Sequence, residues 1–175
     1  MSLDREKHVC STSYISPVGT LELSATEYGL CGLAFEMGAD KNTLHFNTSD
    51  ESWTACACVP HLQDAIDQLD EYFAGTRMTF DLDLDIVTGT DFQRLVWNEL
   101  RNVKFGQTRT YGQIAASIGR AGAARAVGGA NNKNPIAIII PCHRIIGSSG
   151  DLVGFGGGLG IKQALLEHER AHPKR

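Results

Sequence analysis

The sequence of 175 residues contains no apolar run of the roughly 18 residues that a membrane-spanning helix needs. Residues 1–7 are largely charged and have no apolar segment behind them, so they lack the pattern of a secretion signal. We therefore expect a cytoplasmic protein with no membrane partner. Its composition, 42% hydrophobic and 21% charged, is ordinary for a globular protein and argues against a disordered or fibrous chain.

Cysteine is scarce, with five residues at positions 10, 31, 56, 58 and 142. This odd, scattered set favours reduced thiols over a disulfide framework. Cys56 and Cys58 have no second cysteine pair to complete a zinc site, so no metal is predicted. The glycine-rich residues 154–160 are not followed by Gly-Lys-Ser/Thr, which excludes a phosphate-binding loop of the common kind.

Basic residues are rare in the first half of the chain. Residues 1–85 contain 4 Lys and Arg against 15 Asp and Glu, whereas residues 86–175 contain 12 against 5. This asymmetry suggests that the basic half contacts a polyanion such as nucleic acid, while the acidic half is structural or limits non-specific binding. Charge alone does not identify the partner.

The acidic half has the pattern of antiparallel strands followed by a helix. Residues 12–35 alternate apolar and polar side chains around turn signals, which predicts a β-meander. Apolar side chains three and four positions apart in residues 62–73 predict a helix, with Pro60 near its first turn. Residues 80–86 alternate again and predict an edge strand, whose three aspartates are more simply solvated than bound to a cation.

Two capping boxes open helices in the basic half. Thr90 is followed three residues later by Gln93, and Thr110 by Gln113, so each pair predicts a first helical turn. The first of these helices is expected to bury an apolar face made of Phe92, Leu95, Val96, Leu100 and Val103, completed by Trp97.

A helix-turn-helix pattern follows. A turn containing Gly119 and Gly122 joins the second helix to a segment of small residues, 122–130, in which Arg125 is the long side chain. A single reaching side chain gives little base readout, so the pattern favours close approach to a duplex and insertion of Arg125. A small-residue helix packed in a core explains the same sequence equally well.

An apolar run at residues 136–140, between Pro135 and Pro141, predicts a short buried strand. Cys142 and His143 follow it. A free cysteine with a pKa of about 8.5 needs a nearby base or cation to ionise at neutral pH. Neighbouring residues of a strand point to opposite faces, so the pair cooperates only if the chain turns at Cys142. Taken alone, a buried apolar cysteine beside a solvated histidine is the simpler explanation.

The last predicted helix follows the glycine-rich segment. It is expected to end near His172 and carries Glu169. The side chains that we expect it to bury are Ile161, Ala164, Leu165 and His168.

Together these motifs resemble those of the O6-alkylguanine-DNA alkyltransferase family, the methylated-DNA–protein-cysteine methyltransferases. The similarity runs without a gap from about Phe92 to about Glu169, and residues 16–21 agree more loosely. It rests on the sequences Pro141-Cys142-His143-Arg144-Ile145-Ile146, Ala124-Arg125-Ala126-Val127-Gly128-Gly129-Ala130, Asn134-Pro135 and Leu165-Leu166-Glu167-His168-Glu169. The resemblance implies an α+β fold, with an N-terminal antiparallel-sheet domain of the ribonuclease-H-like type at residues 1–87. A C-terminal helical domain at residues 88–175 would carry the helix-turn-helix and the active cysteine.

The implied activity is single-turnover DNA repair. An alkyl group moves from O6 of guanine, and from O4 of thymine, in double-stranded DNA to Cys142, irreversibly and without a cofactor, in a monomeric protein. His143, through a water, accepts the thiol proton, and Glu169 orients and stabilises the imidazolium. Tyr111 hydrogen-bonds N3 of the base and gives it a proton.

The resemblance also assigns binding residues. For the flipped base these are Asn134, the Ile145 carbonyl, Phe155 and the Gly156 N–H, which would stabilise O6. Arg125 would replace the extruded base in the stack. The surrounding DNA contacts fall to Thr110, Ala124, Ala126 and Gly128.

Two departures from the family pattern stand out. Many members carry Ser, or Arg-Trp, where this chain has Gly156 and Gly157, which leaves the range of alkyl groups open. Some members bind zinc in the N-terminal domain, but the matching positions here give Cys31 and otherwise non-ligating residues, so no zinc is predicted.

Three other functions remain to be weighed. An alkyltransferase-like lesion sensor would bind alkylated DNA without reacting, yet sensors of that kind lack the cysteine that this chain has at position 142. A cysteine hydrolase would need an oxyanion hole and would leave the helix-turn-helix unused. A transcriptional regulator would need more base-reading side chains than Arg125.

Overall fold

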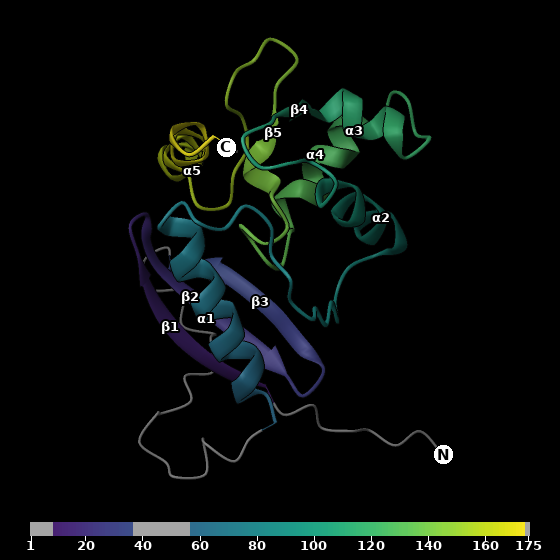
Figure 1. Cartoon of the computed structure of the whole chain (residues 1–175). Coiled ribbons are helices and arrows are strands. Elements are labelled where there is room, and N and C mark those ends of the chain that lie inside the picture. Colours follow the sequence, from purple (N-terminus) through teal and green to yellow (C-terminus); the bar gives the residue numbers. More distant parts are fainter. Residues whose placement is uncertain (1–8, 37–56, 174–175) are drawn as a thin grey trace, which may run out of the picture.

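The computed structural model describes residues 9–36 and 57–173. Within them, the N-terminal half forms an antiparallel sheet of three strands, β1 (Cys10–Ser16), β2 (Gly19–Thr26) and β3 (Gly29–Phe35), in the order β1-β2-β3. Figure 1 shows helix α1 lying along this sheet, with the helices of the second half beyond it. The predicted meander is confirmed.

Helix α1 (Val59–Phe73) packs its apolar face on the sheet. The side chains buried from it are Leu62, Ala65, Leu69 and Tyr72. Pro60 lies in the first turn, where its missing N–H is not needed. Gly75 ends the helical path with φ of 73°, a conformation that glycine adopts without steric cost.

Both predicted capping boxes are present. Thr90 caps helix α2 (Asp91–Leu100) and Thr110 caps helix α3 (Tyr111–Ser117), each through reciprocal hydrogen bonds with the glutamine three residues on. Helix α4 (Ala124–Asn132) packs against both. The expected face of α2 is wrong at Leu95, which is 43% exposed. The predicted burial of Trp97 is confirmed, and its Nε1 donates to the Ala130 carbonyl at 2.8 Å.

Two short strands and a final helix complete the second half of the chain. Strands β4 (Arg109–Thr110) and β5 (Ile145–Ile146) pair in parallel, and helix α5 (Leu159–Ala171) follows. The prediction for α5 is correct for Leu165 but misses three buried side chains, Lys162, Leu166 and Glu169. The other three residues of the prediction are half-buried: Ile161, Ala164 and His168. The buried face of α5 is rotated away from them, toward Lys162 and Glu169.

Residues 136–140 do not form the predicted strand. Ile136 makes one bridge to Leu33 of β3, and the chain then turns, with Ile138 at φ of 68°. The N–H of Ile140 bonds back to the carbonyl of Ile136 at 2.9 Å, so the backbone groups are satisfied by a loop instead of a ladder. The run is apolar because it is buried, which does not require it to be extended.

Residues 80–86 are likewise not an edge strand. They form one isolated bridge, from Leu84 to Leu30, flanked by backbone bonds of Leu30 with Asp83 and Asp85. Apolar and acidic side chains alternate along the segment as predicted, but it makes too few backbone hydrogen bonds with its neighbour to count as a strand.

Cys10 of β1 and Cys58, at the start of α1, form a disulfide with Cα atoms 6.1 Å apart. The prediction of reduced thiols is therefore wrong for this pair. Packing of α1 on the sheet brings together positions 48 residues apart, which sequence spacing cannot show. Cys142 is not in a disulfide, and Cys56 lies outside the described residues. Among those that are described, no helix is long and apolar enough to cross a membrane.

Candidate active site

A single turn of 3₁₀ helix, η2 (Cys142–Arg144), presents the thiol. The N–H of Cys142 bonds to the carbonyl of Ile140 at 2.8 Å, and that of Arg144 to the carbonyl of Pro141 at 3.0 Å. The chain therefore turns at Cys142, as cooperation with His143 requires. The cysteine is 4% exposed. Burial raises the pKa of its thiol, an effect that Asn134 and Lys162 partly offset, so the resting sulfur carries its proton.

His143 points away from solvent and bonds Glu169 of α5. Its Nε2 lies 2.8 Å from Oε1 of Glu169, and both side chains are buried. Burial lowers the pKa of His143 and outweighs the opposite effect of Glu169, which keeps the imidazole neutral at neutral pH. Because an ionised carboxylate only accepts hydrogen bonds, Nε2 carries the ring proton and Nδ1 has a free lone pair. Nδ1 is buried and has no hydrogen-bond partner among the residues that the structure describes.

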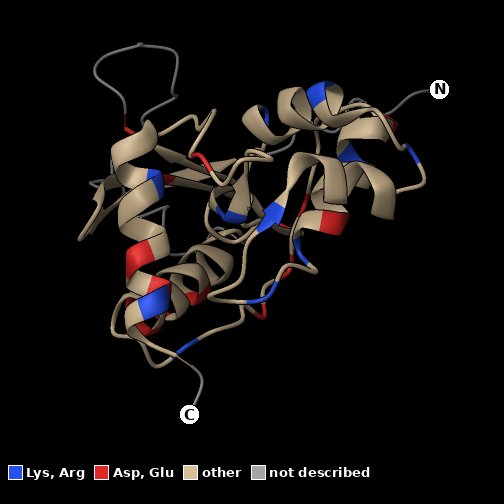
Figure 2. Ribbon diagram, turned by 90° about the horizontal axis from the view of Figure 1, so that it is seen from above, with Lys and Arg blue, Asp and Glu red and all other residues tan. Residues whose placement is uncertain are grey.

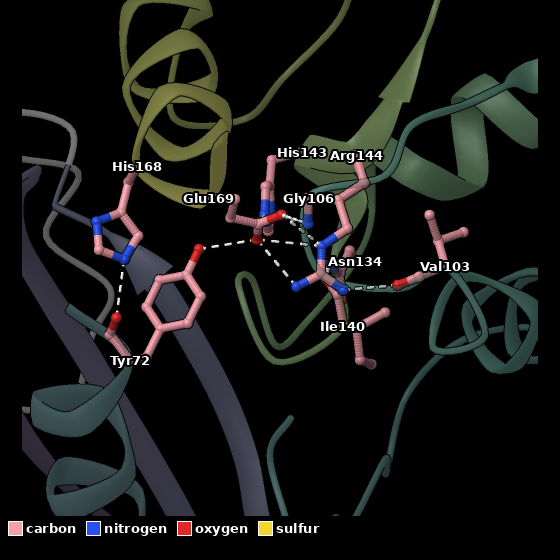
Figure 3. Close-up of polar contacts among 9 residues, drawn as sticks. All are labelled: Tyr72, Val103, Gly106, Asn134, Ile140, His143, Arg144, His168 and Glu169. Atoms are coloured by element: carbon pink, nitrogen blue, oxygen red, sulfur yellow. Dashed lines mark hydrogen bonds and ion pairs between the residues drawn. The ribbon is translucent and has the colours of Figure 1, made fainter. Parts of the chain in front are cut away.

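Glu169 is the centre of a buried polar cluster (Figure 3). Arg144 donates from Nη2 to Oε1 at 2.9 Å and from Nε to both carboxylate oxygens at 3.1 Å, while the backbone N–H of Gly106 bonds Oε2 at 2.8 Å. The hydroxyl of Tyr72 donates to Oε1 at 3.0 Å. Burial favours the neutral acid, but the hydrogen bond from His143 and the hydrogen bonds and charge of Arg144 outweigh it and lower the pKa of Glu169 to about 2.

A pocket of about 200 Å³ opens at Cys142. Asn134, Phe155 and Gly156, all expected to contact the substrate, line it. The end of β3 also contributes to its wall, and the ring centroid of Phe35 lies 5.5 Å from that of Phe155. The pocket is therefore built jointly by the two halves of the chain.

Asn134 and Asn131 hold the loop that leads to the thiol. The Asn134 amide donates to the carbonyl of Ile140 at 2.7 Å and its oxygen accepts the N–H of Ile136 at 3.1 Å. Asn131 donates to the carbonyl of Cys142 at 3.4 Å. Side chains thus replace the strand pairing that the sequence suggested for this segment.

Lys162 lies between Ile145 and Tyr111, two residues that are expected to contact the flipped base. Its Nζ donates to the carbonyl of Ile145 at 2.6 Å and to that of Val153 at 2.8 Å, and it lies 5.9 Å from the ring centroid of Tyr111. The Tyr111 hydroxyl donates to the Val153 carbonyl at 3.0 Å. Burial lowers the pKa of Lys162 to about 8, so it is still largely charged at neutral pH.

The residues expected to contact DNA lie on the two helices of the helix-turn-helix, α3 and α4. Arg125 and Ala126 are exposed in the first turn of α4, beside the half-buried Ala124, and Thr110 opens α3. Gly128 faces Tyr111, since a Cβ there would meet the ring at 3.9 Å. Figure 2 shows Lys and Arg along the helices and loops of this half. Among the described residues of this half, the exposed ones are Arg94, Arg101, Lys104, Arg120, Arg125, Lys133 and Arg170.

Residues 91–171 match the family model described as "6-O-methylguanine DNA methyltransferase, DNA binding domain", and residues 9–86 match that of the same family's ribonuclease-like domain. The chain belongs to this family. It is 46% identical over 157 residues to a Mycobacterium bovis methylated-DNA–protein-cysteine methyltransferase, covering 89% of each chain. The fold class and the family resemblance inferred from the sequence are thereby confirmed.

Solved structures agree with this family assignment. The crystal structure of a Mycobacterium tuberculosis O6-methylguanine methyltransferase superposes with a TM-score of 0.79 at 44% identity, covering 95% of this chain and 96% of that one. The structure of Mycobacterium tuberculosis OGT in complex with DNA gives a TM-score of 0.77 at 44% identity, over 91% and 92%. As a member of this methyltransferase family, the chain binds DNA and acts in DNA repair, by transferring a methyl group from DNA to a cysteine of the protein.

Several residues of the site, among them Arg144, Lys162 and Tyr72, were not assigned from the sequence. Arg144 stood within the thiol motif without a role, and Lys162 lies seven positions before Glu169 on the same face of α5, a spacing that could have indicated it. Tyr72 was read as an apolar residue of α1. Within residues 9–36 and 57–173, no group of three or more His, Cys, Asp or Glu could hold a metal ion.

Proposed function

We propose that this protein repairs alkylated DNA by moving the alkyl group from O6 of guanine, or from O4 of thymine, to Sγ of Cys142, once per molecule. The proposal rests mainly on the position of Cys142. It lies at a pocket and directly before His143, whose Nε2 is hydrogen-bonded to the ionised carboxylate of Glu169. This is the nucleophile, base and orienting group that an activated thiol needs.

The bond changes balance without a cofactor. The bond from sulfur to the alkyl carbon forms while the bond from that carbon to O6 breaks, and its electron pair stays with guanine. A water between Cys142 and Nδ1 of His143 relays the thiol proton, and Glu169 stabilises the imidazolium. Tyr111 delivers a proton to N3 and regains one, through solvent, from the imidazolium of His143, so that the products are neutral guanine, S-alkylcysteine and neutral side chains at Tyr111 and His143.

The unpartnered Nδ1 of His143 supports this proton path. A buried polar atom without a partner is costly, and a water that bonds both Nδ1 and the thiol would satisfy it. The resting state has a protonated thiol and a neutral imidazole, since burial shifts the pKa of each toward its neutral form. The thiolate therefore forms as the substrate arrives, which protects it from other electrophiles.

The target atom lies inside a duplex, so the nucleotide must leave the stack. Arg125 is exposed at the start of α4 and would fill the gap, while small neighbours allow close approach to the minor groove. Tyr111 would exchange its loop carbonyl for N3 of the base. The Ile145 carbonyl, which already accepts from Lys162, retains a second lone pair for the exocyclic amine.

Intact mass measurement tests the proposal. After incubation with duplex containing O6-methylguanine, we expect a gain of one methylene on Cys142, absent in Cys142→Ser. Binding without any mass change would instead identify a lesion sensor. The protein is proposed to act as a monomer in the cytoplasm, with the two parts divided near residue 87; a single-subunit mass in solution, free and alkylated, is the expected result.

A further inference from the structure

Tyr72 reaches the active site from the N-terminal half. It lies in the last turns of α1, is completely buried, and donates its hydroxyl to Oε1 of Glu169, 97 positions away in the sequence, at 3.0 Å. Figure 3 shows the hydroxyl pointing to the carboxylate from the side opposite Arg144. This contact is unusual in the site, because it crosses from one half of the chain to the other.

The ring of Tyr72 is held on several sides. Its centroid lies 5.0 Å from that of His168, 5.4 Å from that of Phe80 and 5.9 Å from that of Phe105. The backbone carbonyl of Tyr72 also bonds Nε2 of His168 at 2.8 Å. With both the ring and the backbone fixed, the hydroxyl is preorganised toward Glu169.

We propose that Tyr72 is a positioning residue for alkyl transfer, through which the N-terminal half holds Oε1 of Glu169 toward His143 and takes up part of its negative charge. The inference rests on the transfer activity proposed above. Oε1 is shared by Nε2 of His143, by Arg144 and by Tyr72. A carboxylate oxygen that accepts several donors stabilises each of them less, so Tyr72 limits how strongly Glu169 favours the imidazolium at rest.

Through Glu169, Tyr72 would influence whether His143 is neutral or protonated before the reaction. The charged or titratable groups around the pair are Cys142 and Arg144 from η2, Lys162 and His168 from α5, and Tyr72 from α1. Arg144 and Lys162 disfavour a positive charge on His143. Tyr72 would act in the same direction through its hydrogen bond to Glu169. Burial and Glu169 raise the pKa of Tyr72 well above its ordinary value, so the hydroxyl remains a donor throughout the working pH range.

Tyr72→Phe removes the hydroxyl and keeps the ring. Without this donor, Glu169 stabilises the imidazolium more, the pKa of His143 rises, and less neutral base is present at low pH. In single-turnover reactions with duplex containing O6-methylguanine, we expect the acid-side midpoint of the rate to rise by about 0.5 to 1 pH unit. Below the midpoint the variant should be about three- to tenfold slower, and at higher pH its rate should return to that of the wild type.

Tyr14→Phe is the matched control. The Tyr14 hydroxyl also donates to a carboxylate, Oδ1 of Asp70 on α1, at 2.7 Å, but it does not touch the relay. Its midpoint should equal that of the wild type. A fall in the rate of Tyr72→Phe that is equal at every pH, or no change at all, would overturn the positioning role. If the wild type itself gained no methyl on Cys142, the proposed function would fail first.

A measurement on the wild type keeps the inference testable if Tyr72→Phe does not fold. The hydroxyl proton of Tyr72 should exchange slowly with water and show nuclear Overhauser contacts to side-chain protons of Arg144. A hydroxyl proton that exchanges freely, with the tyrosine titrating near its ordinary pKa, would contradict the bond to Glu169.

Discussion

The side-chain amide of Asn134 donates to the carbonyl oxygen of Ile140 at 2.7 Å, across the base of the loop that carries the chain to Cys142. Its oxygen accepts the N–H of Ile136 at 3.1 Å, so one side chain closes both ends of the loop. The loop includes Ile138 at positive φ, which a β-branched residue rarely adopts. Asn134 therefore stabilises a conformation that the local sequence does not favour.

Replacing Asn134 by Ala should both destabilise the fold and slow alkyl transfer. The Ile140 carbonyl loses its side-chain donor in a buried region, which costs about 1–3 kcal/mol of unfolding free energy. The pKa of the Cys142 thiol should rise further, because Asn134 is one of the groups that lower it. Urea unfolding and single-turnover rates measure the two effects. Asn102→Ala, which removes an exposed bond to Glu99, is the control and should leave both nearly unchanged.

Glu169→Gln should change the acid stability of the protein. The folded pKa of Glu169, about 2, is below the unfolded value of about 4.3. Its ionisation therefore contributes stability that is fully present above about pH 4.3 and is lost as the pH falls toward 2. The difference corresponds to at most roughly 3 kcal/mol.

Urea unfolding at several pH values tests this assignment. Glu169→Gln should be less stable than the wild type at neutral pH, and the difference should shrink with acid. Glu167→Gln, an exposed change on the same helix, should follow the wild type. A difference that stays constant from pH 7 to pH 3 would mean that Glu169 is not ionised in the folded state.

Arg125→Ala should weaken repair in duplex DNA more than reaction with a free alkylated base. The side chain is proposed to fill the gap left by the flipped nucleotide, and a free base needs no flipping. Comparing single-turnover rates on the two substrates measures the effect. Arg120→Ala removes an exposed positive charge just before α4 and should lower DNA affinity mainly at low salt. Equal losses on both substrates for Arg125→Ala would rule out the flipping role.

Local signals in the sequence predicted much of the fold. Thr90 with Gln93, and Thr110 with Gln113, identified two helix starts because a capping box involves groups within one turn. The strands of the meander followed from alternation and turn residues in the same way. The prediction of a strand at residues 136–140 was wrong, because an apolar run indicates burial but does not show how the backbone hydrogen bonds are formed.

Sequence patterns could not predict the residues that distant parts of the chain contribute to the site. The roles of the thiol, histidine and glutamate came from resemblance to a family. Tyr72 fell among the apolar positions of a predicted helix, and Lys162 received no assignment. Their roles depend on partners 97 and 17 residues away, which only the packing of α1 and α5 brings within hydrogen-bond distance. The Cys10–Cys58 disulfide was missed for the same reason.

Phe35 and Gly157 fix the outer wall of the pocket at Cys142. A Cβ on Gly157 would lie 2.7 Å from Cδ2 of Phe35 and 3.0 Å from Cε1 of Phe155, so glycine is needed for the loop to pass beneath the two rings. Gly157 occupies a position where many family members carry a larger residue. In this chain, Phe35 from the N-terminal half fills the space next to Gly157.

Phe35→Ala should therefore widen the range of alkyl groups accepted. We expect the ratio of single-turnover rates for O6-benzylguanine over O6-methylguanine to rise by about tenfold, because apolar pocket contacts discriminate on this scale. Gly157→Ala should lower both rates by forcing the rings apart, whereas Gly160→Ala, where a Cβ meets nothing within 4 Å in the described structure, should be neutral. Combining Phe35→Ala with Gly157→Ala should recover much of the loss, since the two residues contact each other. An unchanged ratio in Phe35→Ala would show that the pocket's width is set elsewhere.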